Sequence, residues 1–177
     1  MQKEIKVEIE PALLRVLNKI QNREPLMRNI SGIMLDDVHE NFEQEGRPAW
    51  RALSEKTIKD RQSKGYWPGK ILQRTGQLLK SIISKYDNNS AQVGTNKNYA
   101  AIHQFGGTIN QAARQNLFIH SRYTKGKKKG KFKKGTEFGR GSEIQAHTIK
   151  IPPRPFLVLS DSALREIEAE IRKYIHC

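Results

Sequence analysis

The chain has 177 residues, a formal net charge of +14 at pH 7 and a hydrophobic fraction of 36%, which suits one folded domain of ordinary size. No apolar run approaches the roughly 18 residues that a membrane-spanning helix needs, and the polar residues from Met1 to Glu4 are unlike a secretory signal. The single cysteine, Cys177, excludes an intrachain disulfide framework and a multi-cysteine zinc site, so we expect one soluble domain over residues 1–177.

The positive charge is concentrated in two stretches of the sequence. Residues 47–80 hold 9 Lys or Arg against 2 Asp or Glu, and residues 120–143 hold the same numbers. The remaining residues carry 14 basic and 14 acidic groups. This distribution predicts a neutral body with two basic surfaces, rather than a uniformly basic protein that packages DNA.

The N-terminal part of the chain changes from a strand pattern to a helix pattern. Residues 4–10 alternate strictly between apolar and charged side chains, which predicts a half-buried strand. Pro11 suits the first turn of a helix, and apolar residues then recur at helical spacing. A second, longer helix is expected from Leu26 to Phe42, because glycine and proline within residues 46–48 both break helices.

The next segment combines irregular stretches with short helices. Trp50 and Leu53 are expected to hold an irregular stretch against the body. Ser54 is a plausible N-cap for a basic helix over residues 55–64, and Thr75 for another helix over residues 76–83. A loop containing two glycines and a proline separates the two helices.

A hairpin and a short helix are expected after that. Residues 83–86 and 91–95 read as two strands, and the Asp-Asn-Asn-Ser turn between them suits a left-handed backbone. Residues 98–105 then read as a short helix that Gly106 and Gly107 end.

Residues 108–150 are expected to form a basic β-hairpin arm that protrudes from the body. Strand patterns at residues 117–123 and 144–151 flank a glycine-lysine tract that has nothing to bury. The tract could bind phosphates, with an affinity that falls as salt rises, or an acidic protein surface. The basic residues of the arm are Arg122, Lys125, Lys127, Lys128, Lys129, Lys131, Lys133 and Lys134.

The C-terminal residues show the clearest amphipathic helix pattern. Prolines stiffen residues 152–155, Ser160 is a good N-cap, and apolar side chains recur at helical spacing over residues 161–174. Together the patterns predict an α+β fold. It would be a single compact domain with several helices packed on a small, mostly antiparallel sheet, plus the protruding basic hairpin arm.

Two groups of residues are candidates for chemistry. Asp36, His39, Glu40 and Glu43 recur at helical spacing, but an amphipathic helix keeps its polar side there, and further metal ligands are missing. His103 stands in an apolar run without a nucleophile or an orienting acid nearby in sequence. Phosphate-loop, zincin and nucleophile-elbow motifs are also absent from the sequence. We therefore expect no catalysis, no cofactor and no metal site.

Four segments stand out by their order and spacing. They are Trp50-Arg51-Ala52-Leu53-Ser54 with Thr57; Ile71-Leu72 with Thr75-Gly76-Gln77-Leu78-Leu79-Lys80-Ser81-Ile82; Val93-Gly94-Thr95-Asn96 through Tyr99-Ala100-Ala101-Ile102-His103-Gln104-Phe105-Gly106-Gly107; and Pro153-Arg154-Pro155-Phe156-Leu157-Val158-Leu159-Ser160. Over nearly the entire chain they resemble the phage virion morphogenesis family, the tail completion or neck proteins of Mu-like and related tailed phages.

The resemblance implies a structural role late in virion assembly, in which the protein finishes the tail or joins it to the DNA-filled head. Such proteins look like small α+β domains that act as rings, with sixfold symmetry expected, around the DNA channel. The implied partners are copies of the chain, neighbouring neck, connector or tail-terminator proteins, and DNA in the channel. Neither a membrane nor a small-molecule substrate is implied. The expected location is the neck or tail region of the virion, and the host cytoplasm during assembly.

Subunit or partner contacts are expected from residues 50–81, from the arm and from nearby motif residues. The candidates are Trp50, Arg51, Thr75, Gly76, Leu78, Tyr99, His103, Phe105, Arg154 and Phe156. Arg154, held between two prolines, is a candidate clamp for a carboxylate or a phosphate, or else a surface arginine after a proline turn. Two other functions stay open: a free DNA-binding accessory protein that uses the lysine-rich arm, and a hydrolase or nuclease at His103 and residues 36–43.

Overall fold

A computed structural model describes residues 11–115, 126–127 and 143–176 of the chain. The chain divides into two compact units. Unit 1 contains the residues up to Gly106 together with those from Pro152 onward, and unit 2 lies within Gly107–Ile151. The strand expected at residues 4–10 lies outside the described residues. Within the described ranges, no helix is both long enough and apolar enough to cross a membrane.

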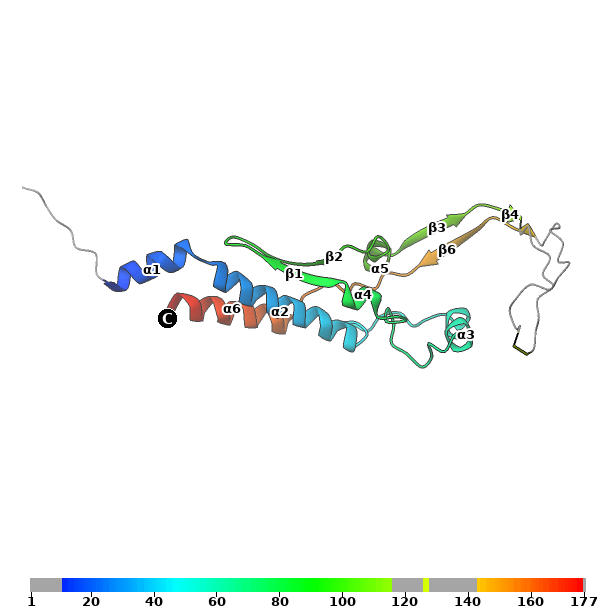
Figure 1. Ribbon diagram of the computed structural model, residues 1–177, viewed down its shortest axis with the longest axis horizontal. Helices are drawn as coiled ribbons and strands as arrows, with labels where there is room; N and C mark the ends of the chain where they lie inside the picture. The colour runs from blue at the N-terminus through cyan, green and yellow to red at the C-terminus, as the bar shows by residue number, and fades with distance from the viewer. Residues whose placement is uncertain (1–10, 116–125, 128–142, 177) are drawn as a thin grey trace, which may run out of the picture. The chain divides into compact units, whose positions relative to one another are not determined.

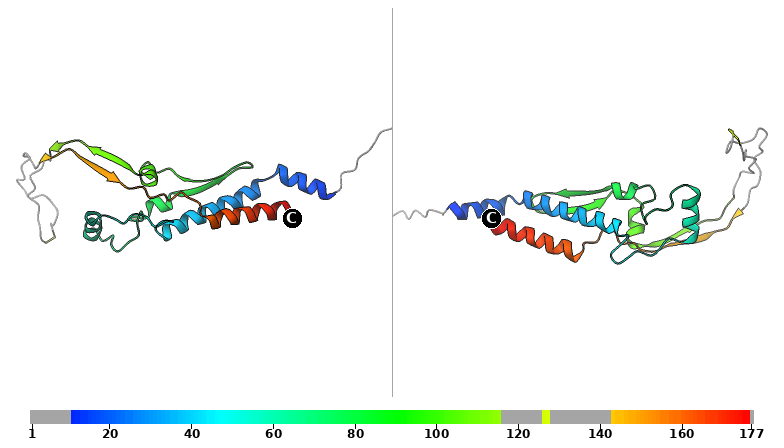
Figure 2. Two further views of the ribbon diagram at one scale, coloured as in Figure 1. Left: turned by 180° about the vertical axis from the view of Figure 1, so that it is seen from behind. Right: turned by 90° about the horizontal axis from the view of Figure 1, so that it is seen from below.

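Helix α2 (Glu24–Glu43) is the central element of unit 1. It packs against α6 (Asp161–His176) and against the hairpin of β1 (Ile82–Tyr86) and β2 (Ala91–Thr95). Figures 1 and 2 show α6 running alongside α2 in each view, while α1 (Pro11–Gln21) precedes α2 and meets the end of α6. The predicted long helices are therefore confirmed.

The sequence of α2 explains both its buried face and its end. Leu26, Ile30, Val38 and Phe42 recur four or eight residues apart, so they share the face that is buried. The helix ends at Glu43, and in the turn that follows Gly46 adopts a φ of +107°, where an added Cβ would clash with the indole of Trp50. A glycine is therefore required at this turn.

The hairpin β1–β2 is antiparallel and pairs Ile82 with Thr95 and Tyr86 with Ala91. Its turn is closed by Asp87, whose Oδ1 accepts the backbone N–H groups of Asn89 (2.7 Å) and Ser90 (2.8 Å). This hairpin agrees with the prediction, because an Asp in this position favours a tight turn through local hydrogen bonds.

The helix predicted over residues 76–83 is wrong in its length and in its cap. Helix α4 covers only Gln77–Lys80, because Ile82 and the residues after it join β1. Gly76, with a φ of +68°, occupies the N-cap position, and no side chain caps this helix, so the expected Thr75 cap is absent. A glycine tolerates this left-handed backbone, which a threonine would not.

Two further short helices follow their expected signals. Helix α3 (Glu55–Ser63) begins at Ser54, whose Oγ accepts the backbone N–H of Thr57 at 3.3 Å. Helix α5 (Ala100–Phe105) ends at Gly106, where φ is +72°. Both ends agree with general capping preferences.

The core of unit 1 is built around aromatic side chains. The ring of Phe42 lies 5.3 Å from that of Phe156 and 5.5 Å from that of Trp50, with the Trp50 ring edge-on. Leu78 and Ile82 belong to the same buried cluster. The cluster therefore joins α2, the loop after it, α4, β1 and the segment before α6.

Unit 2 is made of antiparallel strand pairs. Strand β3 (Gly107–Gln111) pairs with β6 (His147–Ile151), and the short β4 (Arg114–Gln115) pairs with β5 (Glu143–Ile144). The continuous strand expected over residues 144–151 is therefore interrupted after Ile144. The strand expected over residues 117–123 lies outside the described residues. Helices with small antiparallel sheets confirm the α+β class, and the described strands pair in three two-stranded sheets.

Candidate functional site

Three segments that are far apart in the sequence meet at the residues before α6. Pro152 and Pro153 have no backbone N–H, and the chain beyond them forms neither helix nor strand until Asp161. The backbone N–H of Arg154 donates to the carbonyl of His103 at 2.7 Å. The N–H groups of Phe156 and Leu157 both donate to Oε1 of Gln104, at 2.9 and 3.0 Å. Helix α5 thus fixes this segment through hydrogen bonds.

The other side of the same segment is held by α2 and by the loop after it. Nδ2 of Asn41 donates to the carbonyls of Pro155 (3.2 Å) and Phe156 (3.1 Å). Nε1 of Trp50 also donates to the carbonyl of Pro155, at 3.0 Å. Because a buried carbonyl without a partner is costly, these side chains hold the irregular segment in one position.

Arg154 lies inside unit 1, where only 7% of its surface is exposed. Its Nε and Nη2 donate to the carbonyl of Arg51 at 3.1 and 2.9 Å, and Nη2 also reaches the carbonyl of Ala52 at 3.4 Å. The prediction of a clamp for a carboxylate or phosphate, or of a surface arginine, is thereby corrected: the acceptors are main-chain carbonyls. Burial, and then the positive charges of Arg51 and Arg61, lower the pKa of Arg154.

A second buried arginine, Arg61 of α3, lies close to Arg154. It is 5% exposed, and its Nη1 donates to the carbonyl of Lys70 at 2.9 Å, while its buried Nε has no hydrogen-bond partner in the described part of the chain. Burial lowers the pKa of Arg61, as does the charge of Arg74, against the opposing effect of Glu45. Arg74 itself stacks over the ring of Tyr66 at 5.0 Å.

His103 is half-buried on α5, and its surroundings favour the neutral form of the imidazole. Burial, and then the charge of Arg154, lower the pKa of His103. Its Nδ1 is buried without a hydrogen-bond partner among the described residues, and the ring of Tyr99 stands edge-on at 6.1 Å. A general base needs an orienting acid, and among the described residues no acid binds the buried Nδ1 of His103.

The predicted contact residues divide into buried and exposed groups. Trp50, Leu78, Arg154 and Phe156 lie in the interior of unit 1. Arg51, Thr75, Tyr99 and Phe105 are exposed, Phe105 at 78%, and Gly76 begins α4. The side chains of the exposed group are accessible in the described structure, and their contact with a partner stays a prediction.

The basic arm lies mostly beyond the described residues. Lys127 is exposed. The other predicted arm residues lie outside the described residues: Arg122, Lys125, Lys128, Lys129, Lys131, Lys133 and Lys134.

The polar face of α2 contains ion pairs rather than a metal-binding arrangement. Glu40 pairs with Arg47 at 3.4 Å, and Glu43 pairs with Lys70. Within residues 11–115 and 143–176, no three His, Cys, Asp or Glu side chains are placed to hold a metal ion.

Asp37, Asn41 and Gln104 are central residues that the sequence analysis missed. The carboxylate of Asp37 accepts the backbone N–H of Ser160 (2.9 Å) and its hydroxyl (2.6 Å), and it pairs with Arg47 at 2.9 Å. A signal was present for two of them, because Asp37 and Asn41 directly precede Val38 and Phe42 and so lie beside the apolar stripe of α2. A polar residue on a buried stripe indicates a hydrogen-bonding partner in the core.

Comparisons with known proteins match nearly the whole chain. The model of the phage virion morphogenesis family matches residues 6–176. "Mu-like prophage FluMu G protein 2" of Haemophilus influenzae is 38% identical over 167 residues, which cover 94% of this chain and 88% of that protein. "Putative capsid assembly protein G" of Escherichia phage Mu is 34% identical over 102 residues, 55% of this chain and 65% of that protein. No solved structure matches the chain.

Proposed function

Because this chain belongs to the phage virion morphogenesis family, we propose that it is a structural protein of the head–tail junction that completes the tail or neck without catalysing a reaction. In this proposal copies of the chain form a sixfold ring around the DNA channel and contact neighbouring neck, connector or tail-terminator proteins. The relative from phage Mu carries the words "capsid assembly" in its name, which supports a role in building the particle.

The observation that carries the proposal is the exposure of the strands in unit 2. Every residue of β3 is exposed, and so are the first four residues of β6. The cross-strand pair of Ile109 and Ile149 is 37% and 38% exposed. A two-stranded hairpin is only marginally stable by itself in water, so this one needs a partner to cover it. Assembly supplies that partner.

A head-to-tail contact between copies of the chain would produce a ring. If the hairpin of one copy is covered by a different surface of the next copy, the contact is head-to-tail, and repeating it closes a ring when the rotation permits. The exposed Phe105 and Tyr99 of α5 supply aromatic anchors of the kind that dominate binding energy at protein interfaces.

The proposal is tested by deleting the gene from a phage or prophage that encodes this chain. We expect deletion to give heads and tails that do not join into infectious particles, and the chain supplied in trans to restore them. Electron cryomicroscopy of the restored particles should show the chain as a ring at the head–tail junction. Infectious particles that form without the chain would contradict the proposal.

A DNA-binding accessory role is the second candidate, favoured by the lysine tract to which the exposed Lys127 belongs. In the full chain, changing Lys127, Lys128 and Lys129 to glutamine should flatten the slope of log binding constant against log salt by about 0.9 for each phosphate contact that is lost. The binding of a DNA duplex is measured by fluorescence anisotropy over a salt series.

The matched control for this measurement removes three charges from unit 1, by the changes Arg28→Gln, Lys85→Gln and Arg172→Gln. All three residues are exposed. If the control flattens the slope as much as the tract variant does, DNA binding depends on net charge and the tract has no role of its own.

A further inference from the structure

A row of arginines and aromatic rings lies at α3, in the loops on either side of it, and in the segment before α6. We call this the arginine row, and its members are Arg51, Arg61, Arg74, Arg154, Tyr66 and Trp67. The carbonyl of Arg51 binds the guanidinium of Arg154, and the charge of Arg61 acts on Arg154. Arg74 acts on Arg61 and stacks on Tyr66. The hydrogen bond, the stacking and these charge effects place the four arginines and Tyr66 near one another within unit 1, and Trp67 follows Tyr66 in the chain.

Few carboxylates of the described residues offset the positive charges of the arginine row, and one of them is Glu45, whose charge acts on Arg61. In the described part of the chain, the ion pairs within 4.0 Å include none of Arg51, Arg61 and Arg154. Arg74 shares Asp60, at 3.8 Å, with Lys64, which lies closer at 2.5 Å. A buried charge without a counter-charge is costly, because the protein interior solvates ions poorly. Arg51 and Arg74 are the exposed arginines of the row, so they can accept negative charge from outside.

The rings beside the arginines indicate a protein surface. Tyr66 and Trp67 are 40% and 38% exposed, and they follow α3 directly in the chain. Tyrosine, tryptophan and arginine are the residues most enriched at the energetic centres of protein interfaces. An exposed aromatic side chain can cover a buried ion pair and exclude water from it, which strengthens the pair.

We propose that the arginine row is a docking site for an acidic segment of a different virion protein. The carboxylates of that segment would bind the exposed guanidinium groups of Arg51 and Arg74, and Tyr66 and Trp67 would pack over its apolar atoms. The inference rests on the proposed function, since the partner is a protein of the particle. It adds the chemistry of that partner to the proposed assembly role.

A second copy of this chain and DNA fit the site less well. A copy carries a net charge of +14 and has no run of three acidic residues. The bases of a DNA duplex are stacked inside it, so the exposed rings of Tyr66 and Trp67 would find no base to stack on, whereas a peptide offers apolar side-chain atoms.

The test uses the full chain with Lys127, Lys128 and Lys129 changed to glutamine, which weakens background binding by the lysine tract. The probe is a fluorescein-labelled oligoglutamate peptide at near-physiological salt. In this chain the changes Arg51→Gln and Arg74→Gln should weaken peptide binding by about tenfold or more. Both side chains are exposed, so the fold should persist, and circular dichroism checks this. Trp67→Ala provides a second variant that leaves every charge in place and should also weaken binding.

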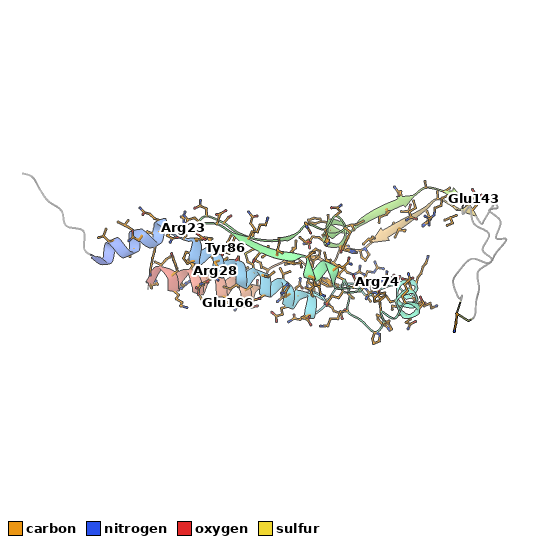
Figure 3. All side chains as sticks on the ribbon, in the orientation of Figure 1. Arg23, Arg28, Arg74, Tyr86, Glu143 and Glu166 are labelled. Carbon is orange, nitrogen blue, oxygen red and sulfur yellow. The ribbon has the colours of Figure 1, made fainter. Side chains whose placement is uncertain are left out.

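The matched control carries Arg28→Gln and Lys85→Gln, which remove the same charge elsewhere in unit 1. Figure 3 shows Arg74 beside α3, whereas Arg28 lies on the N-terminal half of α2. The control should change peptide binding by no more than about twofold, because salt screens distant charges. Equal weakening by the two pairs of changes would overturn the proposal.

Two further outcomes would also overturn it. One is that the changes Arg51→Gln and Arg74→Gln weaken the binding of a DNA duplex more than the control changes do, but leave the binding of the peptide unchanged. The other is that the chain with only these two changes restores infectious particles as well as the unchanged chain does, in which case the proposed function stands without the acidic partner. The proposed function is tested separately, by the gene deletion, and infectious particles that form without the chain would contradict it.

Discussion

Changing Phe156 to alanine is expected to lower the free energy of unfolding by about 3–5 kcal/mol, the usual loss when a buried phenylalanine is truncated. Phe156 is completely buried, and its ring packs against Phe42 in the aromatic core. The cavity would lie where α2, α5 and the segment before α6 meet, and the hydrogen bonds around it hold those elements in place. Little collapse is therefore possible. Urea denaturation followed by circular dichroism measures the loss.

The control is Val158→Ala, two residues further along the same segment. Val158 is exposed, so this change should cost less than about 1 kcal/mol. The comparison also separates packing from partner contact. If Phe156 served a partner rather than the core, Phe156→Ala would leave the unfolding free energy near that of the unchanged chain and impair only assembly.

Periodicity and capping signals were sufficient for the long helices and the first hairpin. The apolar stripes of α2 and α6 are wide enough to predict both helices from the sequence. Asp87 closes the turn of the hairpin with local hydrogen bonds, so this turn was predictable too. A short apolar run is ambiguous, because Ile82 and Ile83 fit the end of a helix as well as the start of a strand. Pairing with β2 decides between them, and that pairing cannot be seen locally in the sequence.

The candidate contact residues were harder to assign, because membership of a motif does not say which way a side chain points. Trp50, Leu78 and Phe156 stand in motif segments and prove to be core residues. Arg154 looked like a presented charge, since prolines flank it, yet its guanidinium turns inward to the carbonyls of residues 51 and 52. Those acceptors lie 102 and 103 residues away in the chain, so no local pattern indicates them.

For the arginine row, the sequence predicted a basic surface but did not show which of its arginines are buried. The excess of basic residues over residues 47–80 predicted a basic surface, and the exposed Arg51 and Arg74 agree with it. The sequence could not show that Arg61 in the middle of this stretch is buried, because a basic helix is normally solvated. Its burial depends on the loop at Lys70, whose carbonyl it binds.

Changing Asp37 to asparagine is expected to cost about 2–4 kcal/mol near neutral pH, because Arg47 loses its buried partner and Ser160 loses a charged acceptor. Ser160 Oγ also accepts the N–H of Ala163 at 3.1 Å, so Asp37 holds the residue that starts α6. An asparagine amide can still accept one of the two hydrogen bonds from Ser160, but its NH₂ group would face the other donor. Chemical denaturation measures the loss.

The same carboxylate predicts how the effect depends on pH. Burial alone would raise the pKa of Asp37, but the hydrogen bonds from the side chain and backbone of Ser160 and the charge of Arg47 outweigh it and lower the pKa below its ordinary 3.8. A lowered pKa means that the stabilisation is complete above the unfolded value and is lost as the pH falls through the folded one. The difference between the unchanged chain and Asp37→Asn should therefore shrink below about pH 4.

The neighbouring Asp36 is the matched control for this measurement. Asp36 is on the same helix and exposed, so Asp36→Asn should alter the unfolding free energy by less than about 0.5 kcal/mol. A loss for Asp37→Asn that equals this value, or that stays constant from pH 7 to pH 3, would show that the carboxylate does not fix the start of α6. In that case the packing of α6 on α2 would have to supply the stability that we assign to Asp37.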